Sequence, residues 1–412
     1  MEIGPIFRAL INHRTRFWLI VTEIALTLAI VANCVHMIQD RRAKMLRPTG
    51  MDVDNILVVE SEPFAAEFQD DDYVEAAYQE DLRALRALPG VRAASAMHQI
   101  PLSGGGSSTS RRAEGSEEET RSSPYYVVGT DIIDALGVEI VAGRAFDESD
   151  YPTREQEDAW ADRGEEPRYR NVIITQDLAD TMFPEGEAVG KALTSKDGLA
   201  VDRVVGVMRR MQCSWPLSSI AERVMLFPSH PASSRRARYM VRAEPGMVDS
   251  LYTSLEEKLL KVNDGRLVSV QTLAEIKGDY YRDLTAMNQL MIGLSVLLIT
   301  VTSLGIIGLT AFSVTQRTRE IGTRRALGAT RLAILRYFLV ENWVTTTSGL
   351  ALGIVFTYGL NYALANLAEA PRIDFPTVAF GMVVLWAVGL VAALAPAIRG
   401  TAVQPVVATQ SI

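Results

Sequence analysis

The chain has 412 residues, 48% of them hydrophobic and 22% charged, and its formal net charge is −8. Because acidic residues outnumber basic ones, the chain lacks the overall positive charge typical of nucleic-acid-binding proteins. We therefore expect no nucleic acid among its partners. The mean hydropathy of +0.11 would suit a soluble protein, but it averages very apolar segments with a long polar middle.

Four apolar stretches are long enough to cross a membrane, since about 20 apolar residues span the hydrocarbon core as a helix. They cover residues 17–38, 287–314, 338–364 and 375–397. The first stretch carries Glu23, and the third has Glu341 and Asn342 near its start. The polar segment 39–286 lies between the first two stretches and is long enough to fold around its own core.

The charge of the short connection 315–337 predicts how the chain is oriented. Short loops rich in Lys and Arg stay in the cytoplasm. Against the single Glu320, this connection holds Arg317, Arg319, Arg324, Arg325, Arg331 and Arg336. With four spans, both termini then lie in the cytoplasm, including the tail 398–412, while 39–286 and the short loop 365–374 lie outside.

The N-terminal region predicts an anchor that is kept. The first apolar stretch is longer than the apolar region of a usual signal peptide, and no small-residue cleavage site follows it. Ahead of it, apolar residues at helical spacing predict a short helix over 1–16 in the cytoplasmic membrane interface. These residues are Ile3, Ile6, Phe7, Leu10 and Ile11.

The segment 39–286 has alternating strand-like and helix-like patterns, so we predict an α/β domain. Strands are expected at 55–60, 91–97, 125–129, 138–140 and 267–271, helices at 72–88 and 247–260, and buried segments at 171–175 and 203–207. The glycine-rich stretch 101–106 predicts a flexible loop, and the acidic stretch 147–170 a mobile surface insertion. Strand and helix units at the two ends could pair into one subdomain, with about 110–225 inserted as another.

Residues with catalytic or metal-binding chemistry do not form a recognisable site. Residues 186–192 resemble a phosphate loop, but they are one residue short between the glycines and lack the Ser or Thr after Lys191. A turn before a strand is therefore expected. His98 near Ser103 is the one nucleophile and base pairing to consider, and without a third partner we expect a structural role. We predict no catalytic residue, cofactor or metal.

Two features of the apolar stretches carry structural hypotheses. Gly349 and Gly353 form a GxxxG pair, which allows close helix approach either within the chain or in a dimer. Glu23 is costly at membrane depth and should face protein or water. Glu23 would take part in a proton or substrate relay or, as we favour, form a packing hydrogen bond to Thr300 or Thr302 as a protonated acid.

Residues 319–329, REIGTRRALGA, resemble the signature of FtsX-like ABC transporter permeases. The segment 39–286 is similar to the MacB-type periplasmic core at 137–146, at Phe183-Pro184 with Gly190-Lys191, and at 204–207. The likeness covers nearly the whole chain, with 287–408 as the permease domain. The chain departs from the family by carrying Glu23 and a less basic C-terminal tail.

The resemblance implies that the connection 315–337 couples to a separate ABC ATPase subunit. Ile321, Ala326 and Leu327 would insert in a groove of that subunit, and Arg324 and Arg325 would pair with carboxylates around it. The full set of expected coupling residues is Arg317, Arg319, Glu320, Ile321, Gly322, Arg324, Arg325, Ala326, Leu327 and Gly328.

The resulting hypothesis is a non-catalytic permease subunit in the bacterial inner membrane, with four transmembrane helices and a large extracytoplasmic α/β domain of two subdomains. It would act as a homodimer or with a homologous permease, among membrane lipids and with a periplasmic adaptor as a further partner. ATP-driven motion would pass through the stalk 275–289 to the outer domain, for export or extraction of a substrate. The alternatives are an FtsX-like regulator of cell-wall hydrolases and a membrane sensor or interaction protein without an ATPase.

Overall fold

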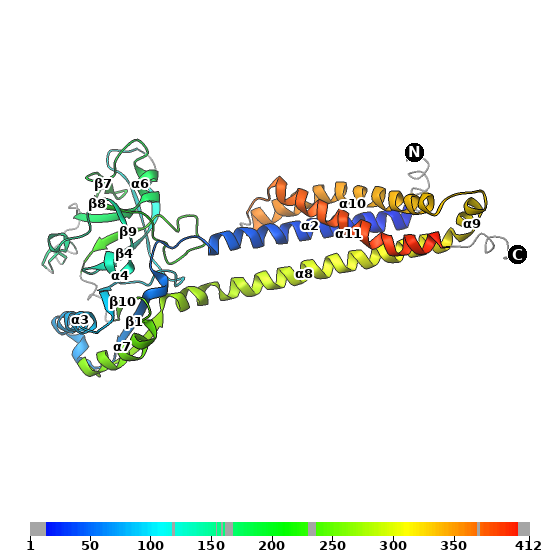
Figure 1. Ribbon diagram of the computed structural model, residues 1–412. Coiled ribbons are helices and arrows are strands. Elements are labelled where there is room, and N and C mark those ends of the chain that lie inside the picture. The colour runs from blue at the N-terminus through cyan, green and yellow to red at the C-terminus, as the bar shows by residue number, and fades with distance from the viewer. Residues whose placement is uncertain are drawn as a thin grey trace. The chain divides into compact units, whose positions relative to one another are not determined.

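The computed structural model describes residues 14–117, 120–153, 155–157, 160, 168–229, 236–368 and 371–402. The chain divides into a helical unit, Met1–Ala43 with Leu284–Ile412, and a sheet-rich unit, Lys44–Asp283. Both are visible in Figure 1. The interfacial helix predicted over 1–16 falls outside the described residues, apart from 14–16, which begin the first long helix.

The helical unit is built from four long helices and one short one. The long helices are α2 (Arg14–Met45), α8 (Leu273–Gln316), α10 (Arg331–Ala368) and α11 (Phe375–Thr401), and α9 (Thr318–Ala326) turns the chain from α8 to α10 (Figure 1). Each long helix is long and apolar enough to cross a membrane. Together with the sheet-rich unit between the first and second of these helices, they confirm the predicted fold class.

Helix α2 lies at the centre of the helical unit. Most of its apolar span is buried, whereas α8, α10 and α11 expose most of theirs, as helices facing lipid do. Ile24 and Leu28 of α2 pack in one cluster with Ile306 of α8, Leu350 of α10 and Leu385 of α11. The unit is therefore organised around the first span.

Buried polar contacts fix both the middle and one end of this bundle. The hydroxyls of Thr27 and Thr302 are 2.7 Å apart and join α2 to α8. Asn361 of α10 donates to Asn33 Oδ1 at 3.0 Å and accepts from the backbone N–H of Ile373 at 3.0 Å. Because buried amides need partners, these bonds specify how α10 and the start of α11 meet α2.

The first sheet of the other unit is antiparallel, with strand order β11-β1-β10-β2. Its strands are β1 (Ile56–Pro63), β2 (Val91–Ala96), β10 (Ala237–Ala243) and β11 (Arg266–Thr272), and α3 (Asp71–Arg86) and α7 (Val248–Val262) pack on it. The Asp70 carboxylate accepts from the backbone N–H of Tyr73 and caps α3. The two helices bury Leu82 and Leu255 against one face of this sheet.

A buried ion pair ties these elements together. The Arg266 guanidinium makes two bonds to the carboxylate of Asp81, and both side chains are almost completely buried. The Tyr239 hydroxyl donates to the same carboxylate at 2.7 Å. One acid on α3 thus binds side chains from β10 and β11.

Seven strands between residues 108 and 228 form the second sheet, with order β5-β8-β6-β9-β4-β3-β7 and a further β8–β7 pairing. Its strands are β3 (Ser108–Ala113), β4 (Arg121–Val128), β5 (Ile140–Gly143), β6 (Arg168–Thr175), β7 (Ala192–Thr194), β8 (Ala200–Met208) and β9 (Met225–Pro228). The shorter elements are α4 (Ile132–Leu136), α6 (Gln176–Met182) and the 3-10 turns Val53–Asn55, Ala66–Gln69 and Glu148–Asp150. As expected, the stretch 186–192 is a turn before a strand.

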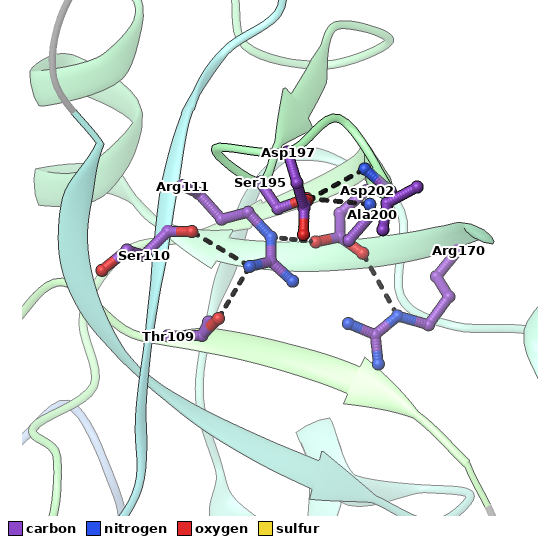
Figure 2. Close-up of polar contacts among 9 residues, drawn as sticks. Thr109, Ser110, Arg111, Arg170, Ser195, Asp197, Ala200 and Asp202 are labelled. Carbon is purple, nitrogen blue, oxygen red and sulfur yellow. Dashed lines mark hydrogen bonds and ion pairs between the residues drawn. The ribbon is translucent and has the colours of Figure 1, made fainter. Parts of the chain in front are cut away.

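A second buried charge cluster lies in this sheet (Figure 2). The carboxylate of Asp202 on β8 accepts from Arg111 Nε at 2.6 Å and from Arg170 Nε at 3.1 Å. The Arg170 guanidinium also lies 3.7 Å from the ring centroid of Phe227. Burial lowers the pKa of Arg170 to about 10, so it stays charged at neutral pH. The cluster joins β3, β6, β8 and β9 around one carboxylate.

Two short segments differ from their predictions. The expected strand at 138–140 begins only at Ile140, because α4 ends at Gly137, whose φ of 66° is accessible to glycine. The expected flexible loop 101–106 is fixed: Leu102 is fully buried, and Gly104 N–H donates to the Ser214 carbonyl at 2.8 Å.

The acidic stretch 147–170 is an integral part of the sheet-rich unit at both ends. Asp150 is buried and accepts from Asn171 Nδ2 at 2.6 Å, and the last residues, from Arg168, belong to β6. Residues 154, 158–159 and 161–167 between these ends fall outside the described chain. The predicted mobile insertion is therefore wrong for its two ends.

Candidate coupling site

The connection between α8 and α10 folds as a nine-residue helix with a defined end. Gly328 has a φ of 97°; its N–H donates to the Arg325 carbonyl at 3.1 Å, and the Ala329 N–H donates to the Arg324 carbonyl at 3.0 Å. These two bonds form a Schellman motif, which needs a left-handed residue and therefore favours glycine. The Leu-Gly-Ala run thus ends α9 and directs the chain into α10.

One face of α9 is anchored within the chain. Ile321 is buried in a cluster with Val314 of α8, Phe338 of α10 and Ala397 of α11. Gly322 is buried beside it. The prediction that Ile321 inserts into a partner is therefore wrong, because its side chain already fills the corner where three helices meet.

Arg317 braces the same corner. Its Nη1 donates to the Tyr337 hydroxyl at 2.8 Å and to Glu341 Oε2 at 3.0 Å, so the end of α8 is bonded to α10. The Arg317 and Glu341 side chains are only 18% and 14% exposed. Separating two charged side chains that are this well buried costs free energy, because each would be left buried without its partner. The contact therefore fixes the position of α8 relative to α10.

The other face of α9 is exposed and basic. Leu327 is 87% exposed, and Arg319, Glu320, Arg324 and Ala326 are exposed around it. Arg324 Nη2 donates to Glu320 Oε1 at 2.5 Å, and its guanidinium lies 5.2 Å from the Tyr337 ring centroid. Arg325 is half-buried and donates to the Thr401 carbonyl at 2.7 Å.

The arrangement is a short rigid helix that presents one apolar side chain among cations. Such a surface fits a groove with an apolar floor and acidic walls, since guanidinium groups pair with carboxylates in two-bond geometry. Of the residues predicted to couple, Arg319, Glu320, Arg324, Ala326 and Leu327 form the outward surface, whereas Ile321, Gly322 and Arg317 face the chain's own helices.

Both glycines of the GxxxG pair face α2. A Cβ atom at Gly349 would lie 2.8 Å from Ile24 Cβ, and one at Gly353 would lie 3.0 Å from Leu28 Cδ2. Neither distance leaves room for a side chain. The glycines therefore allow the close approach of α10 to α2 within one chain, rather than contact between two copies of the chain.

The Glu23 carboxyl group lies against α8 at Gly305. A Cβ atom at residue 305 would lie 2.8 Å from Glu23 Oε2, so the glycine makes room for the acid. The predicted partners are engaged elsewhere: Thr302 bonds Thr27, and Thr300 donates to the Val296 carbonyl. The expected hydrogen bond of Glu23 to either threonine is therefore replaced by packing on a glycine.

The His98 and Ser103 side chains do not form a pair. His98 Nδ1 accepts from the Val127 backbone N–H at 2.8 Å, whereas the Ser103 hydroxyl donates to the Ile100 carbonyl at 2.8 Å. Burial lowers the pKa of the His98 imidazole to about 4. Among the residues that the structure describes, no three His, Cys, Asp or Glu side chains are grouped to hold a metal ion.

Comparison with known proteins identifies the family. The family model of the MacB-like periplasmic core domain matches residues 18–257, and that of the FtsX-like permease C-terminal domain matches 292–405. The chain belongs to the MacB-type, FtsX-like ABC transporter permeases. As a permease of this family with four apolar helices, it is a membrane protein of the bacterial inner membrane.

Relatives of this permease include two from Bacillus subtilis strain 168. The uncharacterized ABC transporter permease YvrN is 26% identical over 68% of this chain and 68% of its own length, and YknZ is 24% identical over 80% and 77%. The macrolide export ATP-binding/permease protein MacB of Chromobacterium violaceum is 24% identical over 68% of this chain, which spans only 42% of that protein.

Solved structures related to the permease include the extracellular domain of YknZ and the periplasmic region of MacB from Actinobacillus actinomycetemcomitans. The first is 16% identical, with a TM-score of 0.33, and covers 53% of this chain and all of its own. The second is 13% identical, with a TM-score of 0.35, and covers 57% of this chain and 97% of its own.

Two residues of the corner where α8, α9 and α10 of the permease meet were not predicted from the sequence. Tyr337 and Glu341 lie one helical turn apart on α10 and together receive Arg317. Their spacing of four residues is the signal that could have been used, since such residues share a helix face. Without the fold, nothing in the sequence connects that face to Arg317.

Proposed function

We propose that this chain is a non-catalytic permease subunit that transmits ATP-driven motion of a separate ABC ATPase to the sheet-rich domain, for export or extraction of a substrate. The observation that carries the proposal is the difference between the two faces of α9. Its buried face packs against α8, α10 and α11, while Leu327, Arg319 and Arg324 are exposed on the other face. A force applied to the exposed face of α9 would therefore also move the ends of α8, α10 and α11 that pack against it.

A single helix leads from α9 to the sheet-rich domain. Helix α8 runs without interruption for 44 residues, which is about 66 Å at 1.5 Å per residue. It follows β11 directly, and Leu273 and Ile276 in its first turn are buried in the core of the sheet-rich unit. The expected stalk 275–289 is part of this helix, so displacement of α9 would reach the core without a hinge loop.

The proposal includes the topology and the partners. Residues 1–16, 315–337 and 398–412 lie in the cytoplasm, and 39–286 and 365–374 in the periplasm, as the arginines of 315–337 favour. Two copies, or this chain and a homologous permease, clasp two ATPase subunits, which carry out ATP hydrolysis. A periplasmic adaptor is a further partner of the outer domain.

Affinity purification from native membranes in mild detergent, with identification of every subunit retained, tests this function. We expect an ABC ATPase in stoichiometric amounts. Recovery of the chain without an ATPase would contradict the proposal, and capture of a cell-wall hydrolase by the outer domain would support the regulatory alternative instead.

A further inference from the structure

A cavity lies in the helical unit, between the ends of α2, α8 and α10 that are nearest α9. One side is apolar and includes Phe17, Ile306 and Phe312, and the other is polar and includes Arg317, Glu341 and Asn342. All of these residues belong to one compact unit, so the cavity does not depend on how the two units are arranged. Its lining changes from apolar to charged along its length.

The wall that α8 contributes to the cavity is about as long as one leaflet of a bilayer is thick. Its lining residues run from Ile306 to Arg317. Eleven residues at 1.5 Å per residue give about 16 Å, and half of a hydrocarbon core of about 30 Å is about 15 Å. An acyl chain lying along this wall would therefore place its headgroup beside Arg317.

The polar end offers one positive and one negative group. Arg317 bonds Tyr337 and Glu341 through the single nitrogen Nη1, and a guanidinium group has further donors on Nε and Nη2. Phosphate oxygens are strong acceptors for such donors, and a carboxylate attracts a primary ammonium group. A pair of opposite charges 3.0 Å apart thus complements a headgroup that itself carries a phosphate and an ammonium group.

We propose that this cavity binds a phospholipid with a primary-amine headgroup of the phosphoethanolamine class. The phosphate lies against Arg317, the ammonium group against Glu341, and an acyl chain along Leu309 and Phe312. Because the same ion pair joins the end of α8 to α10, the bound lipid stabilises the corner from which α9 projects. The inference takes from the proposed function only the side of the membrane, the cytoplasmic leaflet, on which the headgroup lies.

The test measures lipid bound to the full chain without any ATPase, so its result is independent of the coupling function. The chain is purified in mild detergent, and retained phospholipids are counted by native mass spectrometry. We expect phosphatidylethanolamine to be retained by the wild type. Replacing Ser313, which lines the cavity, by tryptophan should reduce retention about tenfold by filling the space. Leu304→Trp on the lipid-exposed face of the same helix should retain the lipid.

A second variant tests the headgroup without changing the size of the cavity. Delipidated chain is titrated with phosphatidylethanolamine, phosphatidylglycerol and phosphatidylcholine, and we expect the first to bind about three- to fivefold more tightly, as for a partly exposed ion pair. Glu341→Gln should remove this preference while phospholipid still binds. Equal binding of the three lipids to the wild type, or equal retention by Ser313→Trp and Leu304→Trp, would overturn the proposal.

Discussion

At the residue scale, the buried acids of the sheet-rich unit are its most sensitive points. Asp81 accepts hydrogen bonds from both Arg266 and Tyr239, and all three side chains are almost completely buried. Removing the charge of Asp81 leaves the Arg266 guanidinium buried and unpaired, which costs about 3–5 kcal/mol. We therefore predict that Asp81→Asn lowers the free energy of unfolding of the full chain in detergent micelles by about this amount, measured by denaturant titration.

Glu257 provides the matched control, because it pairs with Lys261 on the exposed surface of α7. Exposed ion pairs one helical turn apart contribute little to stability. Glu257→Gln should leave the denaturation midpoint unchanged. If Asp81→Asn also left the denaturation midpoint unchanged, the buried network would not stabilise the fold.

His98 makes stability depend on pH. Burial lowers the pKa of His98 to about 4 in the folded chain, below the ordinary value of about 6.5. Between these values the unfolded chain binds a proton that the folded chain does not, so stability falls as pH decreases from about 6.5 towards about 4. We predict a loss of about 2 kcal/mol over this range, reduced from the full linkage value because the ring is partly exposed.

Thermal melts at several pH values, with His98→Asn as the comparison, check this prediction. The asparagine carbonyl can replace Nδ1 as acceptor for the Val127 N–H, but it does not titrate. The variant should show a flatter pH profile than the wild type. An unchanged profile would mean that other groups cause the acid sensitivity.

At the element scale, the packing of α10 on α2 depends on two glycines. Gly349→Leu places a side chain where Ile24 already lies, and overpacking of this kind costs about 1–3 kcal/mol. We predict a lower melting temperature in detergent for this variant. Gly359→Leu on the same helix is the control, because a Cβ atom there meets no neighbour within 4 Å.

The combination of Gly349→Leu with Ile24→Ala sharpens the test. Truncating Ile24 makes room for the new leucine, so the double variant should recover part of the lost stability. Equal melting temperatures for Gly349→Leu and Gly359→Leu would contradict packing of Gly349 on α2 within the chain.

The elements that sequence reasoning found are those with strong local patterns. Strands 55–60 and 267–271 agree with β1 and β11 to within a few residues, because apolar and β-branched side chains dominate them. β3, with the sequence STSRRA, was missed. Its polar residues form a strand because β4 and β7 supply partners, and one of its arginines is held by Asp202. Such contacts have no local signal.

The candidate site shows the same division. The signature 319–329 singled out the segment as the candidate, and Gly328 ends α9 in a left-handed conformation. Which face of α9 points outward could not be predicted, because Ile321 is buried by Phe338 and Ala397, from two helices later in the chain. A helix of nine residues is too short for its own pattern to settle that choice.

At the scale of the whole molecule, the fold class was predictable because membrane spans depend on length and hydropathy alone. The strand order of the two sheets could not be predicted from the sequence. β1 pairs with β10, although residues 108–228, which form the other sheet, lie between these two strands in the chain. The proposed function combines both results: apolar spans that anchor the chain, and one unbroken helix that connects α9 to a packed domain.

The most direct test of transmission through α9 is the ATPase activity of the reconstituted complex with a substitution at Leu327. Leu327 and Leu367 are both 87% exposed, but Leu327 ends α9, whereas Leu367 lies near the far end of α10. We predict that Leu327→Asp lowers the coupled ATPase rate at least about tenfold and weakens ATPase co-purification, as loss of an interface anchor does. Leu367→Asp should leave both unchanged. Full coupled activity in Leu327→Asp, or the same loss in both variants, would contradict transmission through α9.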